Sequence, residues 1–395
     1  MFGKTKPQFS INTKKLIGEA YKIAVKDLQI NYGKDGIYAG PKRFHEYWAR
    51  DSFFASYGSF VLGDFEIVRK NLDLFGHYQS LSGHIPVRVE ERFHGTGLMG
   101  ININHKKPIA LFRPSQPWAG EVVDSNPLYL ICLSEYIVRT KDFAWAKQNE
   151  KHILNSISWI VKKFDKKDLF SEGFNAGWAD FTFKRGNIFY TNILIWHAFK
   201  LLCEALPKSS ASYCVLLTRK LEESIRLNFW DEESGYFIDH IGIHGNKHKV
   251  FASDGNLLAI FYNFATPEQA QKIIRFIDGH KLGQIPVPIY FQGLEWKHKI
   301  LNYLVYPNYN INNTFLWWGS ISSVCRIIVG DKKGALHDLT TLSNIIMRYK
   351  AVPEVVDPKG NLSKTFLYTS EIRSSWAAGM YVYAVNFAEE RGILG

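Results

Sequence analysis

Apolar positions recur at helical spacing along nearly the whole chain. Apolar side chains at i, i+3, i+4 and i+7 form one face of a helix. This periodicity predicts twelve helices, at about residues 11–30, 51–62, 64–80, 124–140, 143–164, 187–206, 209–229, 253–264, 267–279, 312–328, 331–349 and 371–391. The predicted fold class is therefore all-α.

The predicted helices alternate between two kinds. Every second helix is nearly free of charged residues, as in DSFFASYGSFVLG and SSWAAGMYVYAVNFA, whereas the helices between them carry a charged stripe, as in PEQAQKIIRFIDGHK. A helix that is apolar all round is buried, and a helix with one polar face borders water. The even-numbered helices are therefore predicted to form an inner layer and the odd-numbered helices an outer layer.

The connections alternate in length as well. Links from an inner to an outer helix are tight and begin the outer helix with a capping residue or a proline, as at Gly63-Asp64 and Thr266-Pro267. The return links are long and comprise residues 31–50, 81–123, 165–186, 230–252, 280–311 and 350–370. Six hairpins of this kind predict a closed double ring, an (α/α)6 barrel, with all long loops on one rim.

Two of the long loops contain residues that alternate between apolar and polar and include glycine, at 87–112 and 237–251. This pattern is typical of β-hairpins, so small β-hairpins are expected on the same rim. No segment rich in Pro or Ser interrupts the helical pattern. We therefore expect residues 1–395 to form a single catalytic domain.

Composition narrows the class of protein. Hydrophobic residues make up 46% of the chain and charged residues 22%, which is typical of globular proteins and excludes disorder. No apolar run reaches the roughly 18 residues of a membrane span, and MFGKTKPQFSINTKK has no apolar stretch of a signal peptide. The four cysteines, Cys132, Cys203, Cys214 and Cys325, are single, so we expect a reduced, cytoplasmic protein without a membrane partner.

The distribution of charge and the absence of common motifs argue against several classes of function. The net charge is +11, but the Lys and Arg residues are scattered among acids, so no nucleic-acid partner is expected. The chain lacks Gly-rich phosphate loops, HExxH zinc spacing and a GxSxG elbow, so we expect neither a cofactor nor a metal. His240, His244 and His248 share one predicted hairpin, where a solvated hairpin is favoured over a metal site.

Carboxylates and aromatic residues on the long-loop rim remain as candidates. Aromatic residues reach 15%, and Trp and Tyr are common platforms for sugars as well as core residues. Trp48, Arg50 and Asp51 stand at the mouth of the second helix, where an Arg beside an Asp suits several sugar hydroxyls. The alternative is that Asp51 caps this helix.

A second cluster is GWADF, residues 177–181. Asp180 lies between Trp178 and two Phe residues, and apolar surroundings favour the neutral form of a carboxyl, as a general acid requires. The alternative is a surface carboxylate paired with Lys184 or Arg185. Weaker candidates are Asp124 and Asp254, which either cap an inner helix or contact ligand, and Trp318, which either lines the pocket or belongs to the core.

A third cluster is PEVVDP, residues 353–358. Glu354 is flanked by Val and Pro, whereas Asp357 precedes Pro and Gly and is typical of a turn. The hairpins that carry Asp180 and Glu354 stand opposite each other in a ring of six. Two carboxyls flanking one pocket are what glycoside hydrolysis needs, so we expect both in one cavity at the barrel mouth.

The chain resembles the six-hairpin glycosidases, and among them the inverting branch of alkaline and neutral invertases, debranching-enzyme glucosidase domains, trehalases and processing α-glucosidases. The motifs follow one another in order over most of the chain: YWARDSFFASYGSFVLGDFEIVRKNL with SGHIPVRV, VVDSNPLYLICLSEYIVRTKD, GWADF with NIFYTNILIWHAFKLL, FWDEESGYFID, DGNLLAIFYNFATPEQAQ, and PEVVDPKG with SSWAAGMYVYAV. This resemblance implies that Asp180 is the general acid and Glu354 the general base. It also implies that Arg50 and Asp51 contact the sugar in the innermost subsite.

These observations together predict an inverting glycoside hydrolase that acts on a small carbohydrate. It would release a terminal sugar, with glucose as the first choice, from small α-glucosides or oligosaccharides. Alternatives are an invertase-type sucrose hydrolase, a sugar epimerase of the same fold and a non-catalytic sugar-binding barrel. Inversion predicts carboxyls about 6.5–9.5 Å apart, to leave room for a water.

Overall fold

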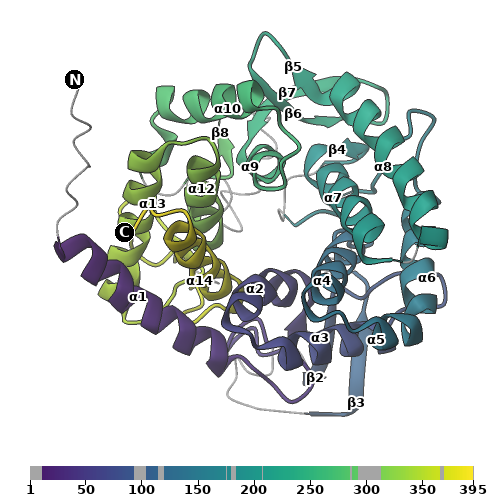
Figure 1. Cartoon of the computed structure of the whole chain (residues 1–395), viewed down its shortest axis with the longest axis horizontal. Coiled ribbons are helices and arrows are strands. Elements are labelled where there is room, and N and C mark those ends of the chain that lie inside the picture. Colours follow the sequence, from purple (N-terminus) through teal and green to yellow (C-terminus); the bar gives the residue numbers. More distant parts are fainter. Residues whose placement is uncertain are drawn as a thin grey trace.

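The computed structural model describes residues 11–92, 104–113, 120–174, 176–178, 184–206, 208–284, 287–291, 313–364 and 369–394. Helices dominate it, as predicted. Those that surround the centre are α2 (Ala49–Leu62), α4 (Ser125–Thr140), α7 (Phe189–Ala205), α9 (Ser253–Phe261), α12 (Leu316–Ile328) and α14 (Ser375–Glu390) (Figure 1). Each of them contacts the next one in this order, and α14 contacts α2, so the inner ring closes.

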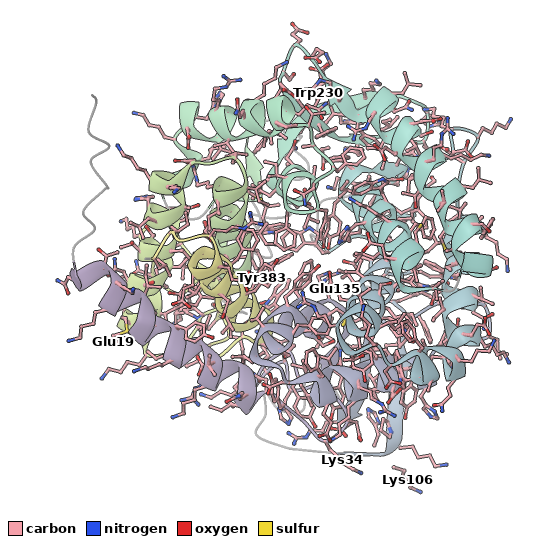
Figure 2. The ribbon with its side chains drawn as sticks, viewed as in Figure 1. Glu19, Lys34, Lys106, Glu135, Trp230 and Tyr383 are labelled. Atoms are coloured by element: carbon pink, nitrogen blue, oxygen red, sulfur yellow. The ribbon has the colours of Figure 1, made fainter. Side chains whose placement is uncertain are left out.

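The remaining helices lie outside this ring (Figure 1). They are α1 (Ile11–Ile30), α3 (Phe65–His77), α5 (Phe143–Gln148), α6 (Glu150–Val161), α8 (Lys208–Phe229), α10 (Pro267–Gly279) and α13 (Lys332–Tyr349). The assignment of inner and outer helices therefore follows the predicted alternation. Among the side chains that reach the centre of the ring are those of Glu135 on α4 and Tyr383 on α14, whereas Lys34 and Lys106 lie at the periphery (Figure 2).

The tight links have the predicted capping chemistry. Thr266 and Gln269 form a reciprocal capping box at the start of α10, with Pro267 in the first turn. Asp142 and Asp331 each accept a backbone N–H at the start of α5 and α13. Gly63 ends α2 in the left-handed region, at φ +79°, where glycine has no steric cost.

Several predicted helix boundaries differ from the structure. The predicted helix 143–164 is divided at Asn149, whose side-chain amide donates to the carbonyl of Trp145. The predicted starts at 187, 312 and 371 are too early, because α7, α12 and α14 begin at 189, 316 and 375. The two residues before α7 and before α12 are extended and pair with other strands, which prevents them from joining the helix.

Short strands gather where the inner helices begin. One sheet pairs β1 (Tyr47–Trp48) with β2 (Arg88–Arg92) and β2 with β3 (Asn104–Leu111), and a second pairs β9 (Thr314–Phe315) with β10 (Val355–Val356). The third contains β4 (Asn187–Ile188), β5 (Trp230–Asp231), β6 (Tyr236–Ile241), β7 (Lys247–Ala252) and β8 (Tyr290–Phe291). The antiparallel pairs β2–β3 and β6–β7 confirm the predicted hairpins at 87–112 and 237–251.

An asparagine near the start of three inner helices fastens the long loop that precedes it. Asn192 accepts the backbone N–H of Phe170 and donates to the carbonyl of the same residue, and Asn256 does the same with Phe237. Asn126 likewise holds the segment at 83–85. The three asparagines stand two residues after Asp124, Tyr190 and Asp254, so the same arrangement holds three long loops close to these polar residues.

Most buried apolar side chains form one continuous cluster that extends through both rings. Within the described residues, no helix has the length and apolar character needed to cross a membrane.

Candidate active site

Polar side chains converge where the inner helices begin. Arg50, in the first turn of α2, donates from Nε to Oδ2 of Asp124 at 2.6 Å and from a terminal nitrogen to Oδ1 at 3.1 Å. The Tyr190 hydroxyl, from α7, donates to the same Asp124 Oδ2 at 3.3 Å. Asp124 occupies the N-cap position of α4 but makes no side-chain capping bond. Its carboxylate therefore pairs with Arg50 and does not cap the helix.

Asp51 follows Arg50 and belongs to the same group of charges. It lies in the first turn of α2 without capping it, because Trp48 is the N-cap residue. Burial raises the pKa of Asp51 to about 7, against the opposing effect of Arg50, and the nearby Asp124 raises it further. This carboxyl can therefore both donate and accept a proton near neutral pH.

Glu172 lies in the loop at 165–186, where its backbone faces Gly186. Its backbone exchanges two hydrogen bonds with Gly186, and its side chain accepts from the Thr191 hydroxyl at 2.5 Å. Burial raises the pKa of Glu172 to about 8, opposed by the Thr191 hydrogen bond and by Lys184. Glu172 is therefore a buried carboxyl near Asp124 whose neutral form is favoured at pH 7.

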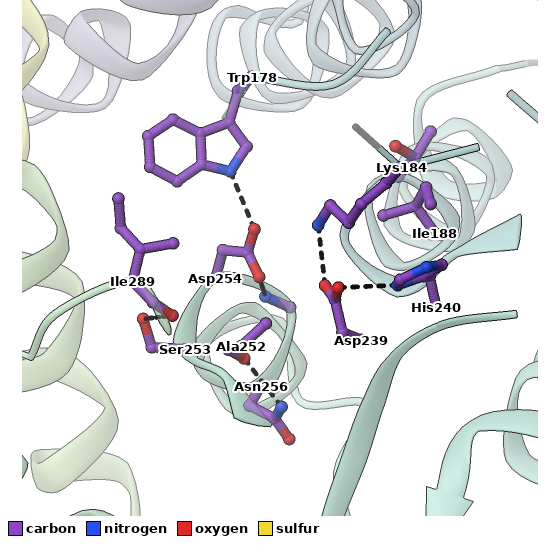
Figure 3. Close-up of polar contacts among 12 residues, drawn as sticks. Trp178, Lys184, Ile188, Asp239, His240, Ala252, Ser253, Asp254, Asn256 and Ile289 are labelled. Atoms are coloured by element: carbon purple, nitrogen blue, oxygen red, sulfur yellow. Dashed lines mark hydrogen bonds and ion pairs between the residues drawn. The ribbon is translucent and has the colours of Figure 1, made fainter. Parts of the chain in front are cut away.

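Two further contacts tie this loop to the start of α9 and to β6. The Trp178 indole N–H donates to Asp254 Oδ2 at 2.9 Å, and the Lys184 ammonium donates to Asp239 Oδ1 at 2.8 Å (Figure 3). The other Asp239 oxygen lies 2.9 Å from Nδ1 of His240. Burial favours the neutral form of Asp239, but Lys184 and His240 outweigh it and lower its pKa. Burial raises the pKa of Asp254.

Aromatic side chains cluster around Trp178. The Trp178 ring contacts Phe315, Trp317, Trp318 and Trp376 at centroid distances of 5.4 to 6.5 Å. Trp317 and Trp318 have no exposed surface, so Trp318, for which the sequence left pocket lining and core as alternatives, is fully buried beside Trp178. Among the described residues, the indole N–H groups of Trp317, Trp318 and Trp376 have no hydrogen-bond partner.

Glu354 lies at the edge of this aromatic cluster. It precedes β10, and its carbonyl accepts from the N–H of Leu316 at the start of α12. Val355 pairs with Phe315, which in turn contacts Trp178. Glu354 as a whole residue is 7% exposed, so it is buried.

Trp48 and Asp180 are the remaining residues that the sequence predicts for the site. Trp48 packs against the guanidinium of Arg88 on the neighbouring strand, 4.7 Å from the ring centroid, and its N–H donates to Glu46. Asp180 lies outside the described residues, and so its separation from Glu354 stays a prediction.

The three histidines predicted to share a hairpin do so. The rings of His240 and His248 stack across β6 and β7 at 3.9 Å, and His240 is also bonded to Asp239. In the part of the chain that the structure describes, no three His, Cys, Asp or Glu side chains are grouped as metal ligands.

Sequence reasoning missed Glu172, Tyr190 and Asp239, and it named Asp254 only as a minor candidate. One available signal was the recurring spacing, since Asp124, Tyr190 and Asp254 each stand two residues before one of the fastening asparagines. Glu172 and Asp239 carry no such signal. Glu172 contacts Thr191, which is 19 residues away in the sequence, and Asp239 contacts Lys184, which is 55 residues away.

Solved structures of glycosidases have the same fold. A rhamnosidase from Klebsiella oxytoca with rhamnose bound superimposes with a TM-score of 0.70 at 15% identity, over 98% of this chain. The chain spans 65% of the length of that rhamnosidase. A wild-type glycosidase superimposes with a TM-score of 0.67 at 12% identity. The match covers 98% of this chain and 100% of that glycosidase.

A third similar structure is the GH63 mannosylglycerate hydrolase from Thermus thermophilus in complex with Tris. It has a TM-score of 0.66 at 13% identity and covers 92% of this chain and 99% of its own. No protein-family model matches the sequence, and no curated protein is significantly similar to it. The resemblance to glycosidases is confirmed at the level of the fold.

Proposed function

We propose that this chain is an inverting glycoside hydrolase built as a single (α/α)6-barrel domain. The observation that carries the proposal is the buried group of carboxyls at the start of the inner helices, which faces a tryptophan cluster. Carboxyls held in both protonation states beside an aromatic surface suit the binding and hydrolysis of a sugar. The glycosidase fold supports the same reaction class, although a fold alone does not determine function.

In the proposed mechanism, Asp180 protonates the leaving oxygen while Glu354 activates a water on the opposite side of the sugar. The Arg50–Asp124 pair and Asp51 would bind hydroxyls of the terminal sugar, and Trp178 would face its apolar side. Asp180 follows the anchored Trp178 by two residues, which supports its assignment to this site. The interior position of Glu354 supports its role as the base.

The proposed substrate is a small α-glucoside or oligosaccharide, and glucose is the first choice as the released sugar. The proposal includes a cytoplasmic location, which the four free cysteines support. A panel of aryl glycosides and disaccharides, read by released reducing sugar, tests the substrate class. Rhamnosides belong in the panel because one similar structure holds rhamnose.

The mechanism is tested with the variants Asp180→Asn and Glu354→Gln. Each should lower kcat by a factor on the order of 10²–10⁴ with little change in KM, because the isosteres keep the contacts and lose the proton transfer. Proton NMR of the first-formed product should show the anomer opposite to that of the substrate.

Asp357→Asn is the matched control for the base. Asp357 accepts hydrogen bonds from the N–H groups of Lys359 and Asn361 in the turn after Glu354, so its loss should leave kcat nearly unchanged. A retained anomeric configuration would contradict the mechanism. Near-normal turnover of Glu354→Gln with inactive Asp357→Asn would show that the base is misassigned.

A further inference from the structure

We propose that the outward face of α8 is an interface between two copies of this chain, which pack with their α8 helices antiparallel about a two-fold axis. The inference does not depend on the proposed function, because none of the residues described above for the candidate site lies on α8.

Exposed apolar side chains are concentrated on this helix. Tyr213, Val215, Leu216 and Leu227 are all exposed, whereas no other described helix or strand carries more than one exposed large hydrophobic residue. Leu227 is 80% exposed, although α8 packs its other face on α7. Single apolar residues on a surface need no explanation, but a group of them on one element marks a site of interaction.

The exposed face has the spacing of a helix that packs along another helix. Leu216, Lys220, Glu223 and Leu227 follow one another at intervals of four, three and four residues, which places them in one row. Leu221, on the other face, is completely buried. The row therefore faces away from the barrel, and α8 lies at the outer edge of the molecule (Figure 1).

This row is complementary to itself in the antiparallel direction. Its middle lies between residues 221 and 222, so a two-fold axis there places Leu216 opposite Leu227 of the second copy. The same axis places Lys220 opposite Glu223 of the second copy, and this ion pair forms twice. A parallel arrangement would instead set like charges against each other, so the charges define both direction and register.

A second copy fits this face better than an apolar partner or a lipid surface does. Either of those would remove Lys220 and Glu223 from water without supplying opposite charges, which is costly. Glu223 accepts from Arg219 of its own helix, but its side chain is 67% exposed and so can reach a second cation. In the proposed dimer, each charge of the row meets its opposite and each leucine meets a leucine.

The contact uses one helix from each copy, so the dimer should be weak. Interfaces below about 1,200 Å² belong to weak or transient complexes. Sedimentation velocity from about 1 µM to about 1 mM protein covers the dissociation constants of such complexes. The sedimenting mass should rise across this range from that of one chain towards that of two chains.

Charge reversal tests the register. Lys220→Glu and Glu223→Lys each set like charges against each other on both sides of the axis, so each should raise the dissociation constant by about 10–100-fold. An equimolar mixture of the two variants should associate as the wild type does, because each variant supplies the charge that the other lacks. This recovery cannot be explained by damage to the fold.

Leu227→Ser tests the apolar part of the row and should raise the dissociation constant by about tenfold or more, because the apolar contact is lost at both ends of the interface. Leu154→Ser is the matched control, since Leu154 is 48% exposed but lies on α6. It should leave the association unchanged. Thermal melting of each variant identifies any loss of fold.

A wild-type chain that stays monomeric over the whole range would overturn the proposal, and a different partner or solvent would then cover this face. A dimer that persists unchanged in Lys220→Glu, Glu223→Lys and Leu227→Ser would overturn it as well, because the copies would then meet elsewhere. A mixture of the two charge variants that stays monomeric would contradict the antiparallel register.

Discussion

Arg50 and Asp124 form an ion pair that is almost completely removed from water. Their side chains are 12% and 0% exposed, and both carboxylate oxygens accept from the guanidinium. The substitution Arg50→Met should lower the free energy of unfolding by about 3–5 kcal/mol, because it leaves the buried Asp124 without its cation. Urea unfolding monitored by circular dichroism measures this change.

Arg219→Met is the control for this prediction. Arg219 pairs with Glu223 on the outer helix α8, and both side chains are largely exposed. Its loss should change the free energy of unfolding by less than about 1 kcal/mol, as is usual for surface pairs. Equal effects of the two substitutions would show that burial does not govern the strength of the Arg50 pair.

Some residues of the site can be predicted from their neighbours in the sequence, and others cannot. Arg50, Asp51 and Asp124 stand out because they mark the start of inner helices, and Glu354 stands out by its apolar flanks. The partners do not stand out, because Arg50 and Asp124 are 74 residues apart and Lys184 and Asp239 are 55 apart. Such pairs are created by the closure of the ring, and no local pattern encodes them.

At the scale of elements, the charge content of each helix was the decisive signal. Helices without a polar face, such as α9, in which all nine residues are buried, can only lie inside. Two-residue strands such as β4 and β9 escaped prediction, because two residues cannot show an alternating period. Their effect is to begin the inner helices two to four residues later than periodicity suggests.

The contact between α2 and α14 closes the inner ring, and two glycines make it possible. A Cβ on Gly379 would lie 2.5 Å from the carbonyl oxygen of Ala55, and a Cβ on Gly58 would lie 2.6 Å from the backbone of Gly379. Gly379→Ala should therefore push the helices apart and lower the free energy of unfolding by about 1–3 kcal/mol or more. Chemical denaturation measures the loss.

Gly18→Ala provides the matched control on the outer helix α1. A Cβ at Gly18 would meet no atom within 4 Å, so only the helical preference of alanine acts there. This variant should be stabilised by about 0.5–1 kcal/mol. If Gly379→Ala were also stabilised, close approach of the two backbones would not be what the glycine provides.

At the scale of the whole molecule, the closed ring brings the N-terminal ends of α2, α4, α7, α9, α12 and α14 together, as the contacts among residues at or next to these ends show. Helix N-termini carry partial positive charge, which favours nearby carboxylates. The alternation of helices predicted the ring, whereas the resulting electrostatic environment depends on all its members and was beyond sequence reasoning.

The buried carboxyls should make stability depend on pH in a defined direction. Burial raises the pKa of Asp51 and Asp338 to about 7 and that of Glu172 to about 8, from 3.8 and 4.5. The folded state therefore holds protons that the unfolded state has lost. This contribution to stability is complete below about pH 4 and is lost as pH rises through 7 and 8.

Buried histidines act at lower pH, because burial lowers the pKa of His84 and of His197, the latter to about 3, from 6.5. They weaken the fold only as pH falls below about 6.5. Between about pH 6.5 and 8 the free energy of unfolding should therefore decrease, on the order of 1 kcal/mol per pH unit for each carboxyl that still holds its proton in the folded state, and it should level off as these carboxyls ionise. Urea unfolding at several pH values in this window gives the slope.

Glu172→Gln tests which group produces the upper part of this slope. The amide stays neutral at every pH, so the variant should lose less stability than the wild type between about pH 7 and 8.5. Glu233→Gln, at a side chain that is 90% exposed, should keep the wild-type slope. A wild-type slope in Glu172→Gln, or stability that increases over this range, would show that Glu172 is already ionised in the folded protein and that its neighbours stabilise the charge.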